Sequence, residues 1–63
     1  MKSNRIRETR YRLGLSSHYV AGRLEIPVDA LRRLEIGKRK VSAEELYILS
    51  RIFGEPMPHL LGK

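Results

Sequence analysis

Residues 15–39 of this 63-residue chain constrain its fold more than any other part. Their sequence, LSSHYVAGRLEIPVDALRRLEIGKR, predicts two short helices joined by a tight turn and followed by a basic loop. Apolar residues recur at helical spacing from Val20 to Leu24, after Ser16, whose residue type caps helix N-termini. Pro27 interrupts this pattern because it has no backbone N–H, yet its fixed φ suits the first turn of a new helix.

The second helix of this unit is expected to end near Glu35. Leu31 and Leu34 form its apolar side, and Gly37 is the residue type that ends helices. Two helices of this length around a three- or four-residue turn form the supersecondary unit that places one helix in the major groove of DNA.

Further helices are expected on both sides of the unit. The first begins near Ser3 or Asn4 and runs to Leu13. Another starts at the sequence SAEE of residues 42–45, a capping box in which serine and glutamate side chains satisfy backbone amides reciprocally, and it runs to Phe53. Residues 59–61 are expected to form a short fifth helix. We therefore predict an all-α fold, a compact bundle of five helices.

The apolar positions of these helices define the predicted core of one domain that spans residues 1–63. Such a short chain buries only about 60% of its unfolded surface, so we expect modest stability. The predicted core residues are Ile6, Leu13, Leu15, Val20, Ala21, Leu24, Ile26, Leu31, Leu34, Leu46, Leu49, Phe53, Leu60 and Leu61.

The net charge of +6 is distributed unevenly. Residues 1–40 hold eleven Lys and Arg against four acids, a balance of +7, whereas residues 41–63 hold two against three, a balance of −1. A basic half beside a nearly neutral half is typical of a small nucleic-acid-binding domain. The chain has no cysteine, no apolar run long enough for a membrane span and no signal-peptide pattern, which favours a cytoplasmic location at the nucleoid.

In this order and spacing, the motifs resemble the DNA-binding domain of the phage repressor and Cro type, the lambda-repressor-like helix-turn-helix family. The resemblance implies a helix-turn-helix protein that binds double-stranded DNA sequence-specifically as a transcriptional regulator or repressor. A homodimer, at least on DNA, is a separate hypothesis. It spans roughly residues 4–62, and the matching segments are RIRETR at 5–10, LGLS at 13–16, Val20-Ala21, Leu24, Ile26, Leu31, residues 34–38, Phe53-Gly54 and residues 60–62.

The resemblance also implies which residues read bases. In the family, the first turn of the second helix of the unit and the residue about one turn later contact base edges. Here these positions are Val28, Asp29, and then Arg32 or Arg33. Arginine can bond a guanine, valine can contact a thymine methyl group, and aspartate can only accept from a cytosine amine. Asp29 has an alternative role as the cap of its helix.

One family position in the turn differs in this chain. Glu25 stands where the family usually has glycine, at a place that often requires a left-handed backbone conformation.

Phosphate contacts are expected from two segments. The free amides and the positive dipole end at the start of the first helix of the unit form a natural phosphate seat. A basic loop after the second helix can position the domain without reading sequence; a merely solvated loop is the less favoured alternative. The candidate residues are Ser16, Ser17, Lys38, Arg39 and Lys40.

Arg10 and Glu35 are interpreted as structural residues. In the resembled family the matching arginine and glutamate form an ion pair between the first and third helices, so the resemblance implies the same pair here.

Tyr47, Ile48 and Ile52 are a possible dimer contact. The two isoleucines lie one turn apart, away from the stripe of Leu46, Leu49 and Phe53. They could equally complete the core, because isolated apolar residues on a surface are common.

Catalysis has little support in this sequence. His18 and His59 lie on different expected elements without a ligand or catalytic partner at suitable spacing, and no glycine-rich phosphate loop is present. We therefore expect no enzyme activity, no cofactor and no metal site. The alternatives to sequence-specific DNA binding are a protein-interaction module and an engineered scaffold that keep the helix-turn-helix fold with weak or no base reading.

Overall fold

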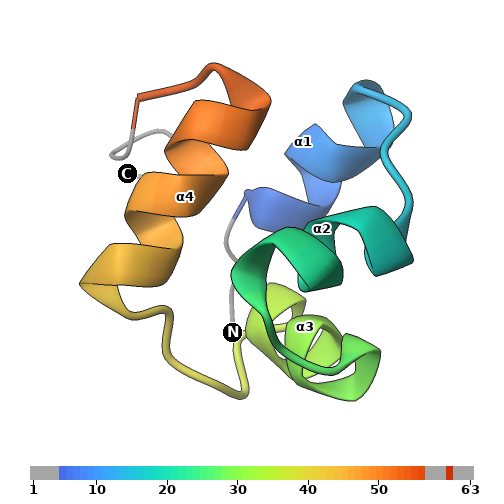
Figure 1. The fold of residues 1–63 in the computed structure, drawn as a ribbon, viewed down its shortest axis with the longest axis vertical. Helices are drawn as coiled ribbons and strands as arrows, with labels where there is room; N and C mark the ends of the chain where they lie inside the picture. Colours follow the sequence, from blue (N-terminus) through green and yellow to red (C-terminus); the bar gives the residue numbers. More distant parts are fainter. Residues whose placement is uncertain (1–4, 57–59, 61–63) are drawn as a thin grey trace.

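A computed structural model describes residues 5–56 and residue 60. These residues form four α-helices and no strand, which confirms the all-α prediction (Figure 1). Helix α2 packs against both α3 and α4, and α1 packs against α4. The helices are α1 (Ile6–Arg12), α2 (Ser17–Leu24), α3 (Val28–Glu35) and α4 (Ala43–Phe53).

The expected five helices are not matched by the described residues, which form four. Of the segment expected to form the fifth, only Leu60 is described; its side chain is fully buried, and its carbonyl accepts a hydrogen bond from the Arg5 amide at 2.9 Å. This bond ties the end of the described chain to the start of α1. Helix α1 begins at Ile6, and the start expected at Ser3 or Asn4 lies outside the described residues.

The start and end of α2 follow from local hydrogen bonds. The Ser16 hydroxyl accepts a bond from the Tyr19 amide at 3.0 Å, which confirms the predicted cap. Directly after the helix, Glu25 has φ 59° and ψ 42°, the left-handed conformation expected in the turn. The amides of Glu25 and Ile26 bond the carbonyls of Gly22 and Ala21, the two bonds of a Schellman motif.

Helix α3 starts without a side-chain cap. Pro27 occupies the N-cap position, and its carbonyl accepts bonds from the Ala30 and Leu31 amides. Asp29 lies inside the first turn and is exposed, so its alternative role as the helix cap is wrong. The helix ends at Glu35, as predicted, and Gly37 has the positive φ that suits glycine after a helix.

Helix α4 begins with the predicted capping box. The Ser42 hydroxyl accepts from the Glu45 amide, and the Glu45 carboxylate accepts from the Ser42 amide, each at 3.1 Å. The helix ends at Phe53, before Gly54, also as predicted.

The core lies where all four helices meet. The prediction of Leu13 as a core residue is wrong: 42% of its surface is exposed. Helix α1 ends at Arg12, so Leu13 does not extend the buried side that the helix forms with Ile6, Thr9 and Arg10. Predicted Leu61 lies outside the described residues, and Leu15, Ile26 and Leu46 are partly buried against the core. The buried apolar residues are Ile6, Val20, Ala21, Leu24, Leu31, Leu34, Leu49, Phe53 and Leu60.

Candidate nucleic-acid interface

A buried ion pair fixes α3 against α1. Arg10 Nε lies 2.7 Å from Glu35 Oε2, and Arg10 Nη2 donates to Glu35 Oε1 at 3.2 Å. Only 6% of Arg10 and 4% of Glu35 is exposed. The hydrogen bonds that Arg10 donates to the Glu35 carboxylate raise the pKa of Arg10, and Arg10 Nη1 also donates to the Leu15 carbonyl at 3.1 Å. This bidentate geometry sets the position of α3 relative to α1.

The α3 residues that the sequence predicts to read bases lie on two different faces of the helix. Val28 and Arg32, four residues apart, line a hollow between α1 and α3. Asp29 and Arg33 have the same spacing on the next face, and both are exposed and outside the lining of this hollow. The two arginines that the sequence could not separate are therefore in different surroundings.

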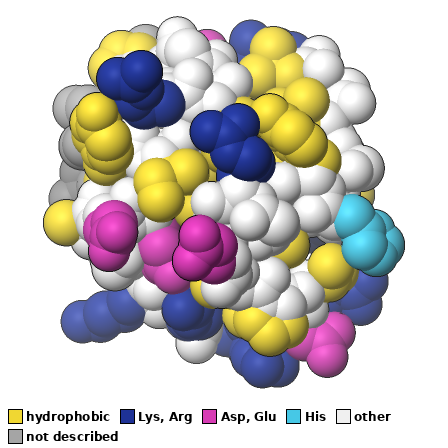
Figure 2. All heavy atoms as spheres, in the orientation of Figure 1, with side chains coloured by type: hydrophobic (Ala, Val, Ile, Leu, Met, Phe, Trp, Pro, Cys, Tyr) yellow, Lys and Arg dark blue, Asp and Glu magenta, His cyan; other side chains and the backbone are white. Residues whose placement is uncertain are grey.

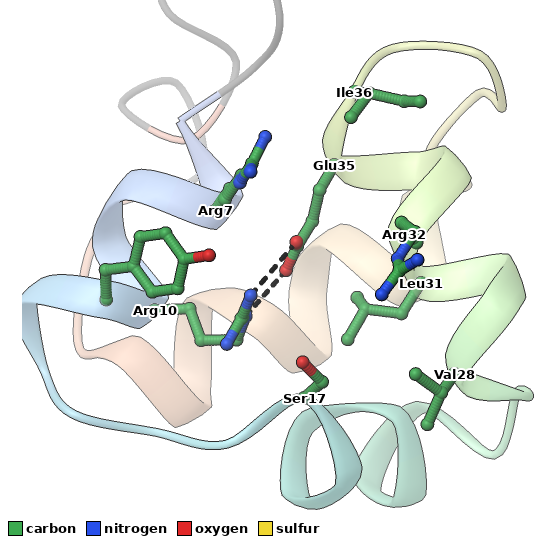
Figure 3. A pocket seen from close by; sticks show the side chains of 9 residues that line it. Arg7, Arg10, Ser17, Val28, Leu31, Arg32, Glu35 and Ile36 are labelled. Atoms are coloured by element: carbon green, nitrogen blue, oxygen red, sulfur yellow. Dashed lines mark hydrogen bonds and ion pairs between the residues drawn. The ribbon is translucent and has the colours of Figure 1, made fainter.

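This α1–α3 hollow has a volume of ≈ 310 Å³. Figure 3 shows Arg7 and Arg10 of α1 on one side, Val28 and Arg32 of α3 on the other, and the Arg10–Glu35 pair between them. The start of α2 closes one end with Ser17. The lining residues are Arg7, Arg10, Tyr11, Ser17, Val28, Leu31, Arg32, Glu35 and Ile36.

Positive charge dominates the α1–α3 hollow. Three arginines line it against the single carboxylate of Glu35, which is already paired with Arg10. In the part of the chain that the structure describes, neither Arg7 nor Arg32 makes an ion pair. The Arg7 guanidinium lies 5.8 Å from the centre of the Tyr11 ring, and its hydrogen bond to the phenol lowers the pKa of Tyr11 from 10.0. Two cationic side chains thus remain available to a ligand.

The sequence-based site did not include Arg7 or Tyr11. A signal was present, because the two residues lie one helical turn apart on α1 and flank Arg10. Arg32 lies 25 positions after Arg7 and 21 after Tyr11 in the sequence, so only the folded chain brings the three together.

At the start of α2, the two serines are placed differently. Ser16 uses its hydroxyl oxygen to cap the helix, whereas Ser17 lines the α1–α3 hollow. Among the described residues, the amides of Ser17 and His18 have no acceptor, as expected for the first turn of a helix.

In the basic loop after α3, two of the three cations form no ion pair with a described residue. Arg39 Nη2 lies 3.1 Å from Glu45 Oε2, the same carboxylate group that completes the capping box of α4. Arg39 therefore ties the loop to α4, whereas Lys38 and Lys40 are exposed. Figure 2 shows Lys and Arg side chains along the lower edge of the molecule, where Figure 1 has α3 and this loop.

The proposed dimer residues on α4 are mixed in exposure. Ile48 and Ile52 are partly buried and pack against the core. Tyr47 is exposed, and its hydroxyl accepts a bond from Arg51 at 3.2 Å.

Two other kinds of feature are absent from residues 5–56 and 60. No group of three or more His, Cys, Asp or Glu residues could hold a metal ion. No helix is long and apolar enough to cross a membrane.

Comparison with known protein families shows which family the sequence matches. The sequence model of a family described as helix-turn-helix matches residues 6–60. No curated protein and no solved structure matches the chain. The matched region includes all four helices, the Arg10–Glu35 pair and the α1–α3 hollow.

Proposed function

Because the chain belongs to the Cro/C1-type helix-turn-helix family of DNA-binding transcription regulators, we propose that it is a repressor that recognises a specific double-stranded operator through α3. Binding across a promoter would exclude competing proteins from the same DNA. We also propose that it acts at the nucleoid and binds as a homodimer, with Tyr47, Ile48 and Ile52 of α4 as the contact between copies.

The observation that carries this proposal is the placement of α3. The buried Arg10–Glu35 pair holds the inner side of the helix, while Asp29 and Arg33 are exposed on its outer side. A helix held rigidly by its inner face, with exposed polar residues on its outer face, is the arrangement that enters a major groove. The basic loop at residues 38–40 follows directly and can contact the DNA backbone.

The surroundings of the α3 residues support different roles in DNA binding. Arg33 is exposed and can reach the O6 and N7 atoms of a guanine, and we propose it as the main base-reading residue. Val28 supports it by contacting a thymine methyl group. Arg32 borders the α1–α3 hollow and contacts the backbone instead. Asp29 carries a negative charge into the interface, so it limits affinity.

The test begins with selection of bound sequences from a random duplex pool. Fluorescence anisotropy then compares Arg33→Ala and Arg32→Ala on the selected duplex and on a scrambled one. Arg33→Ala should lose ~1–3 kcal/mol of binding free energy on the selected duplex and much less on the scrambled one. Arg32→Ala should lose the same binding free energy on both duplexes. Asp29→Asn should tighten binding to both duplexes, because a negative charge near the phosphates disappears.

Arg51→Ala is the matched control, since Arg51 lies in the last turn of α4, at the opposite end of the molecule from α3 (Figure 1). It should leave both affinities unchanged. If no variant of α3 changes binding more than this control, α3 does not enter the groove, and a role as a protein-interaction module becomes the better explanation of the fold.

A further inference from the structure

Base reading uses the outer face of α3. The α1–α3 hollow has features that this role does not require. It is open to solvent beside α3, and at ≈ 310 Å³ it is larger than a single phosphate group. Arg7 and Arg32 approach it from opposite sides and form no ion pair with any described residue. The one carboxylate in the lining, on Glu35, is held by Arg10 and does not neutralise them.

The lining also has an apolar part. Val28 and Leu31 of α3 and Ile36 directly after it contribute hydrocarbon surface, and Tyr11 contributes an aromatic ring from α1. Guanidinium groups bind phosphate oxygens through charge-assisted hydrogen bonds, while apolar walls bind the carbon skeleton that carries the phosphate. Ser17 supplies a hydroxyl, and the start of α2 supplies free amides at the same end of the hollow.

We propose that the α1–α3 hollow is a binding site for a phosphate ester, in which Arg7 and Arg32 hold the phosphate and the apolar wall contacts the attached carbon skeleton. The ester has two possible sources, a free small molecule or the backbone of bound DNA. In its DNA form this inference rests on the proposed function and extends the interface from α3 to α1. If the ester is a free small molecule, it competes with DNA, because Arg32 contacts both the ester and the DNA backbone.

The first experiment contains no DNA. The chain is titrated with phenyl phosphate and with inorganic phosphate at constant ionic strength, and backbone amide shifts are followed by NMR. Amides around Arg7, Tyr11 and Arg32 should shift and saturate, with phenyl phosphate binding more tightly because its ring contacts the apolar wall. Arg7→Gln and Arg32→Gln, both at exposed positions, should each raise the Kd for phenyl phosphate about tenfold.

Arg51→Gln is a matched control for Arg7→Gln. Arg51 stacks on Tyr47 one helical turn away at 5.8 Å, the same distance that separates Arg7 from Tyr11, but it lies outside the hollow. The control should bind phenyl phosphate as the unmodified chain does. Amide shifts that fail to saturate with phenyl phosphate overturn the proposal. So does a control variant that loses as much affinity for phenyl phosphate as Arg7→Gln does.

The second experiment identifies the source of the ester. Duplexes are prepared in which single backbone phosphates are replaced by uncharged methylphosphonates. If DNA occupies the hollow, Arg7→Gln weakens binding to the normal duplex but not to the duplex that lacks one defined phosphate. If a free ester occupies it, the Arg7→Gln variant binds phenyl phosphate more weakly. The same variant still binds the normal duplex as tightly as the Arg51→Gln control does.

These results separate this inference from the proposed function. Saturable phenyl phosphate binding without any duplex binding contradicts the proposed function and supports the hollow as a site for a free ester. Sequence-selective duplex binding without saturable phenyl phosphate binding contradicts this inference alone.

Discussion

Glu25 keeps a left-handed backbone conformation at the end of α2, with φ 59°. It is the one non-glycine residue with positive φ among residues 5–56 and 60, where Gly14, Gly37 and Gly54 hold the other such positions. In this conformation the Cβ atom of an L-residue approaches its own backbone, at a cost of roughly 1–2 kcal/mol. The Schellman hydrogen bonds of the turn hold the residue in place despite this cost.

Replacing Glu25 with glycine should therefore stabilise the fold. Glycine removes the steric cost but adds entropy to the unfolded chain, so the expected net gain in the free energy of unfolding is about 0.5–1 kcal/mol. Urea denaturation followed by circular dichroism measures it. Glu25→Gln, which removes the charge and keeps the Cβ atom, should show no such gain. A loss of stability in Glu25→Gly would mean that the glutamate side chain makes a stabilising contact that outweighs the strain.

At the scale of elements, a buried ion pair links α1 to α3 beside the apolar core. Arg10 and Glu35 come from helices that are far apart in the sequence, and both are almost completely buried. A buried pair adds little net stability compared with apolar residues of similar size, because both charges lose their hydration. Removing one of the two partners is costly, because the remaining charge is then buried without a partner.

Single and double replacements of this pair should be strongly non-additive. Arg10→Met or Glu35→Leu alone should each cost ~3–5 kcal/mol, whereas the double variant should cost less than either single one. Urea unfolding measures all three. Arg12→Met is the control, because its pair with Glu55 lies in an exposed place and should contribute at most about 1 kcal/mol. Additive effects of the two core replacements would show that the side chains act independently.

At the scale of the whole molecule, the basic surface depends on which cations the fold leaves unpaired. The sequence presents residues 38–40 as three equivalent positive charges. In the folded chain Arg39 joins the loop to the first turn of α4 through Glu45, while Lys38 and Lys40 are exposed. Lys38 and Lys40 therefore have no ion-pair partner among the described residues, and we expect them to contact DNA phosphates.

The salt dependence of DNA binding should report this difference. Each phosphate contact contributes a slope of about 0.9 to the fall of log affinity with log salt concentration. Replacing both Lys38 and Lys40 with alanine should flatten the slope by about two, and adding Arg39→Ala should change it little further. Anisotropy titrations over a range of salt concentrations measure the slopes. An equal contribution from all three residues would mean that Arg39 leaves Glu45 when DNA binds.

The sequence by itself determined the features that depend on near neighbours. The Ser16 cap, the Ser42–Glu45 capping box and the end of α3 before Gly37 each involve residues within a few positions of one another, so local sequence specifies them. The Arg10–Glu35 contact spans 25 positions, and it could be anticipated only through the family resemblance.

The tertiary structure alone decided the features that depend on packing between helices. Leu13 is exposed because α1 stops one residue earlier, although its residue type and spacing suit a core. Arg39 has a partner because the loop brings it to α4, and Arg32 differs from Arg33 because α1 lies beside only one face of α3. The α1–α3 hollow has the same origin, since its lining comes from three helices whose relative positions are fixed by the buried core and the Arg10–Glu35 pair. Side-chain spacing sets which residues share a helix face, but only the packing of the helices sets what each face meets.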